Sequence, residues 1–244
     1  MEQHPLLLST SNTTILIRLS AILTITFLSL WANHEASKGL QTTIMLSNPS
    51  FLAGRHFNLL FVSNGAAERL IYRASHSVEH ELYPANDLHS KKPVLHVTLY
   101  MASQNLNTDV TVTPDNVPNQ FTIHLSPSLM AKADIKTSVA AAIHRGVARV
   151  WLFHGGGTAP PFVLDAMVEC LAMLAGFSKA SYDTEEERRL KSGLLQRCEH
   201  ERQGFVTRLN EAMREHWTED AAEEWVVSRP YAAGAGCEES RQVM

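Results

Sequence analysis

The sequence is poor in cysteine and in net charge. Its 244 residues include three cysteines, at positions 170, 198 and 237, which is too few for a small domain held together by several disulfides. The formal net charge is −4, so bulk charge gives no support for binding to nucleic acid or to an anionic membrane surface. With 45% hydrophobic and 19% charged residues, the composition is that of an ordinary globular domain.

A phosphate-binding loop is also missing. Gly155, Gly156 and Gly157 stand before a predicted helix, which is where such a loop would lie, but no Lys-Ser or Lys-Thr pair follows them. Instead Pro160 and Pro161 begin the next segment, and proline is common at the first position of a helix. The glycines therefore predict a tight turn between two helices.

One long hydrophobic run is present, at residues 13–32, and Arg18 is its only charged residue. Its length is that of a membrane-spanning helix, and the part after Arg18 also fits the core of a signal peptide. A signal-peptide cleavage site requires a small residue two positions before the last residue of the signal. The residues two positions before Ala32 and Ala36 are not small. This favours an uncleaved transmembrane signal-anchor over a cleaved signal peptide.

Either alternative predicts entry into the secretory pathway, with a membrane-anchored luminal or extracellular domain, or a secreted one if the segment is cleaved. Residues 1–12 are then an N-terminal tail and residues 33–40 a short linker. In that compartment one disulfide is expected, between Cys198 and Cys237, with Cys170 as a buried thiol.

The rest of the chain shows strands followed by helices. The β-branched and aromatic content of short segments indicates strands, and a helical pattern separates the second strand from the third. Charged stretches in the last third predict solvated helices, and the tail at 230–244 predicts disorder. The expected strands are 41–47, 57–63, 93–101, 109–113 and 120–126, and the expected helices outside the central region are 65–82, 185–200, 204–216 and 218–229.

The central stretch, residues 140–169, holds the most informative charges. Arg145 and Arg149 are four residues apart on one apolar helix, and Asp165 and Glu169 repeat that spacing on the next. Residues four apart lie on the same face of a helix. Because the second helix is otherwise apolar, its carboxylates need partners, and we predict that they pair with the two arginines across the interhelical cleft. The alternative is that the arginines extend to solvent and the acids face elsewhere.

This stretch resembles the plant basic secretory protein family, whose pattern runs approximately HExxHVWQWNGxGTAPxxLIEGIADY. Further similarity lies in the IHLS segment around His124 and in GFVTRLNEAMR from Gly204. The register that aligns the two patterns places Arg145, Gly146 and Arg149 at the family's His, Glu and second His, and places Asp165 and Glu169 at its Glu and Asp. The residues that fix this register are Val150, Trp151, Gly155, Gly157, Thr158, Ala159 and Pro160.

The resemblance implies an α+β, zincin-like metallopeptidase fold at 41–229. In it a small mixed sheet packs on a site helix, a C-terminal helical subdomain follows, and the N-terminal transmembrane or signal helix lies outside. The strand at 120–126 would be the edge strand beside the site helix. The resemblance also implies that the third metal ligand and a supporting acid would come from the positions of Asp165 and Glu169.

The zinc chemistry of that family is nevertheless predicted to be lost. A zinc site of this type needs two imidazoles one turn apart and a glutamate that takes a proton from the metal-bound water. Arginine stays protonated and offers no lone pair, and glycine cannot act as a base. We therefore predict that the site holds no metal and no catalytic residue, because its ligand and base positions are occupied by Arg145, Gly146 and Arg149.

Three histidines remain as possible cleft residues. His124 is interpreted as forming a structural hydrogen bond, because one imidazole does not bind a metal alone. His144 and His154 are ten residues apart and do not share a helical face at ligand spacing. A metal site made of His144, His154 and Asp165 is kept as an alternative.

The function that these residues favour is a non-catalytic, zincin-fold binding protein. Its partner would be an unidentified peptide or protein, with membrane contact through residues 13–32, no nucleic acid and no cofactor. Plant defence is the role that the resemblance suggests. The alternative is a metallopeptidase-type hydrolase with non-standard ligands.

Overall fold

The computed structural model describes residues 12–37, 40–47, 51–83, 91–177, 195–196, 198 and 204–217. Most of the helix expected at 185–200, the helix expected at 218–229, Cys237 and the tail lie outside these residues. The chain divides into two compact units, residues 1–41 and 42–244, and each is described by itself.

The described part of the first unit contains helix α1 (Asn12–Ser37), which continues past the predicted apolar segment into the expected linker. Apolar side chains such as Ile22 and Phe27 are exposed along it, and the hydroxyl of Thr24 donates to the carbonyl of Ser20 at 2.7 Å. Among the described residues there is no helix that is both long and apolar enough to cross a membrane. The transmembrane segment expected at 13–32 is therefore not supported.

A four-stranded mixed sheet forms the centre of the second unit, in the order β1-β2-β4-β3. Parallel pairing of β2 with β4 places Leu99 opposite Ile123, whereas β3 pairs antiparallel with β4. This mixed sheet with helices confirms the α+β class. The strands are β1 (Gln41–Leu46), β2 (His96–Met101), β3 (Val110–Pro114) and β4 (Gln120–Leu125).

The expectation that the strand at 120–126 is the edge strand was wrong, because β4 lies inside the sheet and β3 forms its edge. The two strands make a hairpin in which Pro114 pairs with Phe121. A turn between them, in which Asp115 N–H donates to the carbonyl of Gln120 at 2.9 Å, folds β3 back along the open side of β4.

The segment 57–63 is helical rather than a strand. It contains the end of α2 (Leu52–Phe57) and a π-helix, η1 (Asn58–Val62). Phe57 and Phe61 are both buried, and their rings stack with centroids 5.3 Å apart. A spacing of four residues brings side chains to one face of a helix, so the burial of this pair selects a helix despite the aromatic and β-branched composition.

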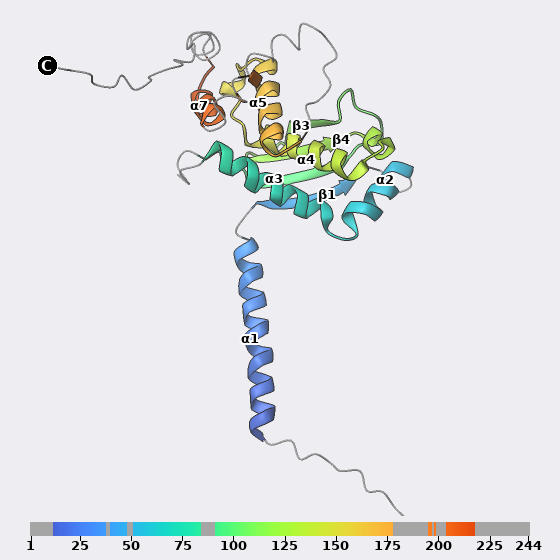
Figure 1. The fold of residues 1–244 in the computed structure, drawn as a ribbon, viewed down its shortest axis with the longest axis vertical. Coiled ribbons are helices and arrows are strands. Elements are labelled where there is room, and N and C mark those ends of the chain that lie inside the picture. The colour runs from blue at the N-terminus through green and yellow to red at the C-terminus, as the bar shows by residue number, and fades with distance from the viewer. Residues whose placement is uncertain are drawn as a thin grey trace, which may run out of the picture. The chain divides into compact units, whose positions relative to one another are not determined.

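Two long helices pack against each other beside the sheet, as Figure 1 shows. The first is α3 (Ala66–Leu82), and the second is the predicted site helix, α4 (Ile135–Trp151). Helix α4 begins where the side chain of Asp134 accepts a hydrogen bond from the Thr137 N–H at 3.1 Å, as an N-cap residue does. Helix α4 also contacts β3 and β4, which fixes one of its faces against the sheet.

The remaining helices follow the glycine turn, which is a short 3-10 helix, η3 (Gly155–Gly157). Next come α5 (Pro161–Leu174) and α7 (Phe205–Ala212). A disulfide joins Cys170 of α5 to Cys198, so the expected pairing of Cys198 with Cys237 and the expected free thiol at Cys170 were wrong. Both bonded cysteines are buried, and Cys170 lies on the inner face of α5. The spacing of the cysteines in the sequence does not indicate that Cys170 is close to Cys198.

Candidate functional site

The two arginines of α4 face the two acids of α5. Arg145 donates from Nε to Oε1 of Glu169 at 2.8 Å and from Nη2 to Oε2 at 3.1 Å. Arg149 donates from Nη1 to Oδ1 of Asp165 at 2.7 Å. The residue earlier in α4 thus meets the residue later in α5, as expected for helices that run in opposite directions. The predicted pairing of arginines with acids is confirmed.

The two ion pairs differ in their exposure to solvent. The side chains of Arg145 and Glu169 are 14% and 8% exposed, whereas those of Arg149 and Asp165 are 28% and 45% exposed. A guanidinium that grips a carboxylate with two nitrogens holds its orientation strongly. The Arg145–Glu169 pair is therefore the one that holds the two helices together, and the Arg149–Asp165 pair lies at the more solvent-exposed end of the site.

Gly146 lies where α4 comes closest to the sheet. A Cβ atom at this position would lie 2.6 Å from Cγ2 of Ile123 and 3.1 Å from Cγ2 of Val110. Such contacts are well inside normal van der Waals distance, so neither alanine nor the glutamate of the family pattern fits unless Ile123 and Val110 shift. Glycine thus replaces the expected general base, and close packing leaves little space for a side chain at this position.

Sequence reasoning missed Lys92, which lies at the C-terminal end of α4. Its Nζ donates to the carbonyls of Val150 at 2.7 Å and Leu152 at 2.6 Å, and it lies 3.4 Å from Nδ1 of His154. The carbonyls at a helix C-terminus lack helical partners and carry partial negative charge, which explains why a cation is placed there. No sequence pattern relates a lysine before β2 to the end of α4.

Burial and neighbouring cations lower the pKa values in this cluster. The pKa of Lys92 falls to about 7 because the amine is buried and, secondarily, because Arg149 is near. The pKa of His154 falls to about 4 through burial, with Lys92 and Arg149 as further causes. His154 is therefore neutral at pH 7 and offers one ring nitrogen to the lysine.

A buried polar network connects this end of α4 to α7. The hydroxyl of Tyr83 donates to the carbonyl of Trp151 at 3.2 Å and accepts from Nδ2 of Asn210 at 3.4 Å. Oδ1 of Asn210 in turn accepts the Phe153 N–H at 2.9 Å. Burial raises the pKa of Tyr83, which keeps its hydroxyl protonated. These contacts fix α7 against the segment that follows the site helix.

The three candidate histidines lie in separate environments. His124 forms a hydrogen bond with Oγ1 of Thr113 at 2.9 Å and contacts the Tyr100 ring edge-on, which confirms its structural interpretation. His144 is 4% exposed, and its ring lies 5.3 Å from that of Phe177. Neither of its ring nitrogens has a hydrogen-bond partner among the described residues. Burial, with Arg145 as a second cause, lowers the pKa of His144 to about 4.

The residues at the predicted zinc positions do not fit a zinc ion. Guanidinium groups cannot ligate a metal, and both of them already bind the carboxylates that would otherwise be available. Across the described part of the chain, no three His, Cys, Asp or Glu residues are grouped so that they could hold a metal. In particular, His144, His154 and Asp165 are not brought together as the alternative site required.

Comparison with known proteins shows the family of this chain. Residues 37–229 match the basic secretory protein family, described as peptidases of plants and bacteria. The match covers most of the chain, so the chain belongs to this family. No match was found among curated proteins or among solved structures.

Proposed function

We propose that this member of the peptidase family has a zincin-like fold without zinc chemistry and acts by binding a peptide or protein. The observation that carries the proposal is the pair of arginines at the expected ligand positions, each engaged by an acid of α5. Gly146 supports it, because the expected position of the general base has no room for a side chain. Without the two imidazole ligands and the glutamate of the family pattern, these positions cannot activate water by the zinc mechanism.

The test is to purify the full chain and to measure its zinc content and its cleavage of a general protein substrate. We expect no stoichiometric zinc and no cleavage that a chelator abolishes. The variant to compare with the wild type restores the family pattern by three substitutions, Arg145→His/Gly146→Glu/Arg149→His. We expect it to fold poorly or remain inactive, because the side chain introduced at position 146 would collide with Ile123. One tightly held zinc per wild-type chain, with chelator-sensitive proteolysis, would support the alternative of a hydrolase with non-standard ligands.

The disulfide supports a location in the secretory pathway. Disulfides persist in oxidising compartments and are rare in the cytosol, and the Cys170–Cys198 bond joins two buried sulfur atoms. Fractionation of cells that express the full chain tests this location. Recovery of the folded protein in the cytosol with reduced Cys170 and Cys198 would contradict it.

A further inference from the structure

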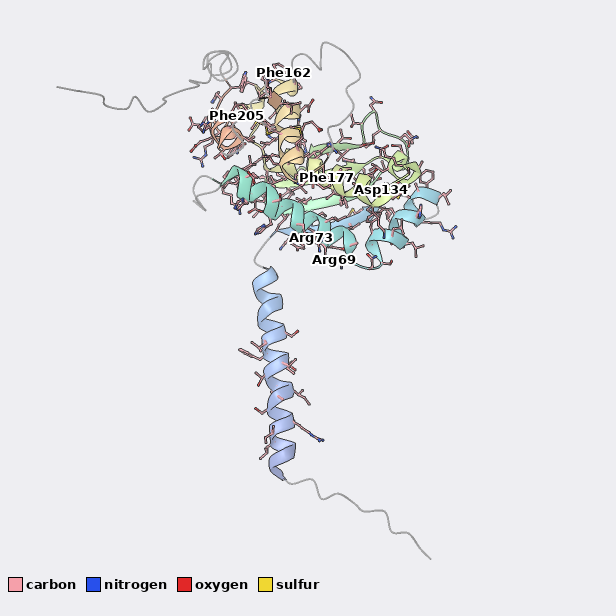
Figure 2. The ribbon with its side chains drawn as sticks, in the orientation of Figure 1. Arg69, Arg73, Asp134, Phe162, Phe177 and Phe205 are labelled. Carbon is pink, nitrogen blue, oxygen red and sulfur yellow. A yellow bond between two sulfur atoms is a disulfide. The ribbon has the colours of Figure 1, made fainter. Side chains whose placement is uncertain are left out.

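The outer face of α3 carries a row of basic side chains. Arg69, Arg73, His76 and His80 are all exposed, and spacings of four, three and four residues place them within an arc of roughly 60° on the helix. The opposite face holds the buried core residues of α3, among them Ile71. Figure 2 labels Arg69 and Arg73 along this helix. We call these four residues the α3 basic row.

No acidic residue lies within this row. Helix α3 has no Asp or Glu between Glu68 and Glu79, and Glu79 is already paired with Lys91. Among the described residues, no acid forms an ion pair with Arg69 or Arg73. Arg69 instead donates from Nη1 to the carbonyl of Asn64 at 2.8 Å, which orders its guanidinium at the beginning of the helix. Within the row, Nδ1 of His80 lies 3.7 Å from Oε1 of Glu81. The positive charge without an acidic partner among the described residues is therefore that of Arg69 and Arg73.

We propose that the α3 basic row binds an extended acidic peptide segment of a partner protein. The rise of a helix places the four basic residues roughly 4.5–6 Å apart along its axis, and an extended strand presents side chains on one side about every 6.6 Å. Acidic residues at alternate positions of such a strand would therefore face successive members of the row. This surface is separate from the Arg145–Arg149 site, so the proposal does not depend on the function proposed above.

The shape of the row favours a peptide over other anionic partners. It is one residue wide, and Glu68 and Glu79 lie on its flank by helical spacing, where they would repel a flat anionic membrane. The whole chain carries a net charge of −4, which opposes a long, densely charged polymer such as nucleic acid more than a short peptide.

Fluorescence polarisation with the full chain at low salt tests this proposal. The probe is a labelled ten-residue peptide of alternating glutamate and serine, and a second peptide has the same composition with its glutamates in one block. We expect the alternating peptide to bind more tightly and Arg69→Gln/Arg73→Gln to weaken its binding by about fivefold to tenfold, as expected for two exposed ion pairs. Lys132→Gln/Lys136→Gln is the control, because it removes the same charge from two exposed lysines elsewhere.

The outcomes separate the proposal from its rivals. Unchanged binding by the Arg69/Arg73 variant, or equal weakening by the lysine control, would overturn the assignment of this surface. Equal affinity for the two peptides would contradict the extended geometry. Tighter binding of single-stranded oligonucleotides or anionic vesicles than of the alternating peptide, lost in the Arg69/Arg73 variant, would show that the partner class is wrong.

Discussion

At the scale of single residues, the two ion pairs have the same chemistry but different surroundings. Removing one partner of a buried pair typically costs about 3–5 kcal/mol, whereas an exposed pair contributes under about 1 kcal/mol. Glu169 is 8% exposed and Asp165 is 45% exposed. The stability contribution of the site is therefore concentrated in Arg145 and Glu169, although the two arginines, like the two acids, are only four residues apart on their helix.

Double-mutant cycles test this difference. We expect Arg145→Ala to lower the free energy of unfolding by about 3–5 kcal/mol, because it removes the cation that faces the buried Glu169 carboxylate. Arg149→Ala is expected to lower it by less than about 1 kcal/mol, as is Lys132→Ala, which breaks the exposed pair with Asp109. Urea unfolding of the single and double variants measures each coupling. Equal coupling in the two pairs would show that burial does not set their strength.

His144 gives the protein a specific sensitivity to acid. Its pKa is lowered from 6.5 to about 4 in the fold, so as pH falls below 6.5 the unfolded chain takes up this proton first. The protonation of His144 therefore does not affect the free energy of unfolding above pH 6.5. As pH falls from 6.5 towards 4, it lowers the free energy of unfolding by about 3 kcal/mol in total.

Unfolding measured between pH 7 and 4 in wild type and His144→Leu checks this prediction. At pH 7 we expect the leucine variant to be as stable as wild type or more so, because it leaves no buried nitrogen without a partner. At pH 4 its advantage should increase by about 3 kcal/mol. Parallel losses in the two proteins over this pH range would contradict the assignment to His144.

At the scale of elements, contact between α4 and the sheet fixes the site helix. A glycine inside a helix normally costs about 1 kcal/mol relative to alanine, so Gly146 is unfavourable for helix formation taken alone. The 2.6 Å approach of Ile123 Cγ2 to the place of its missing Cβ explains why glycine stands there. Close packing of the helix on β4 outweighs helix propensity at this position.

Gly146→Ala should therefore destabilise the protein by about 1–3 kcal/mol, the usual cost of adding a carbon to a packed core. In an Ile123→Ala background the same change should cost much less or become stabilising, because the colliding Cγ2 is gone and the helical preference of alanine remains. Urea unfolding of all four proteins closes this cycle. A stabilising effect of Gly146→Ala in the wild-type background would mean that α4 is not held so close to the sheet.

At the scale of the whole molecule, the disulfide links α5 to a part of the chain 28 residues away. Closing a loop of this length restricts the unfolded chain and stabilises the fold by roughly 3–4 kcal/mol in the chain-entropy description. We expect Cys170→Ala/Cys198→Ala to lose about this much stability, and Cys237→Ala to lose little. Peptide mapping under non-reducing conditions should recover Cys170 bonded to Cys198. A Cys198–Cys237 peptide would contradict this pairing.

Several features of the protein follow from the sequence alone. The β-branched and aromatic content of short segments predicted the strands β1 to β4, and helical patterns predicted α3 and the helices on both sides of the glycine turn. Four-residue spacing on two apolar helices predicted the ion pairs, because buried carboxylates need partners and the arginines were the nearby cations. The family followed from the residues around the glycine turn, and the α+β class from that resemblance. These features depend on local pattern or on the identity of single residues.

Other features depend on the tertiary structure. The helix at 57–62 depends on the joint burial of Phe57 and Phe61, and the disulfide partner of Cys170 depends on which segment packs over α5. Lys92 lies far from the α4 carbonyls in sequence but 2.6–2.7 Å from them in space. Long-range packing sets each of these contacts, and no local preference of the chain specifies it.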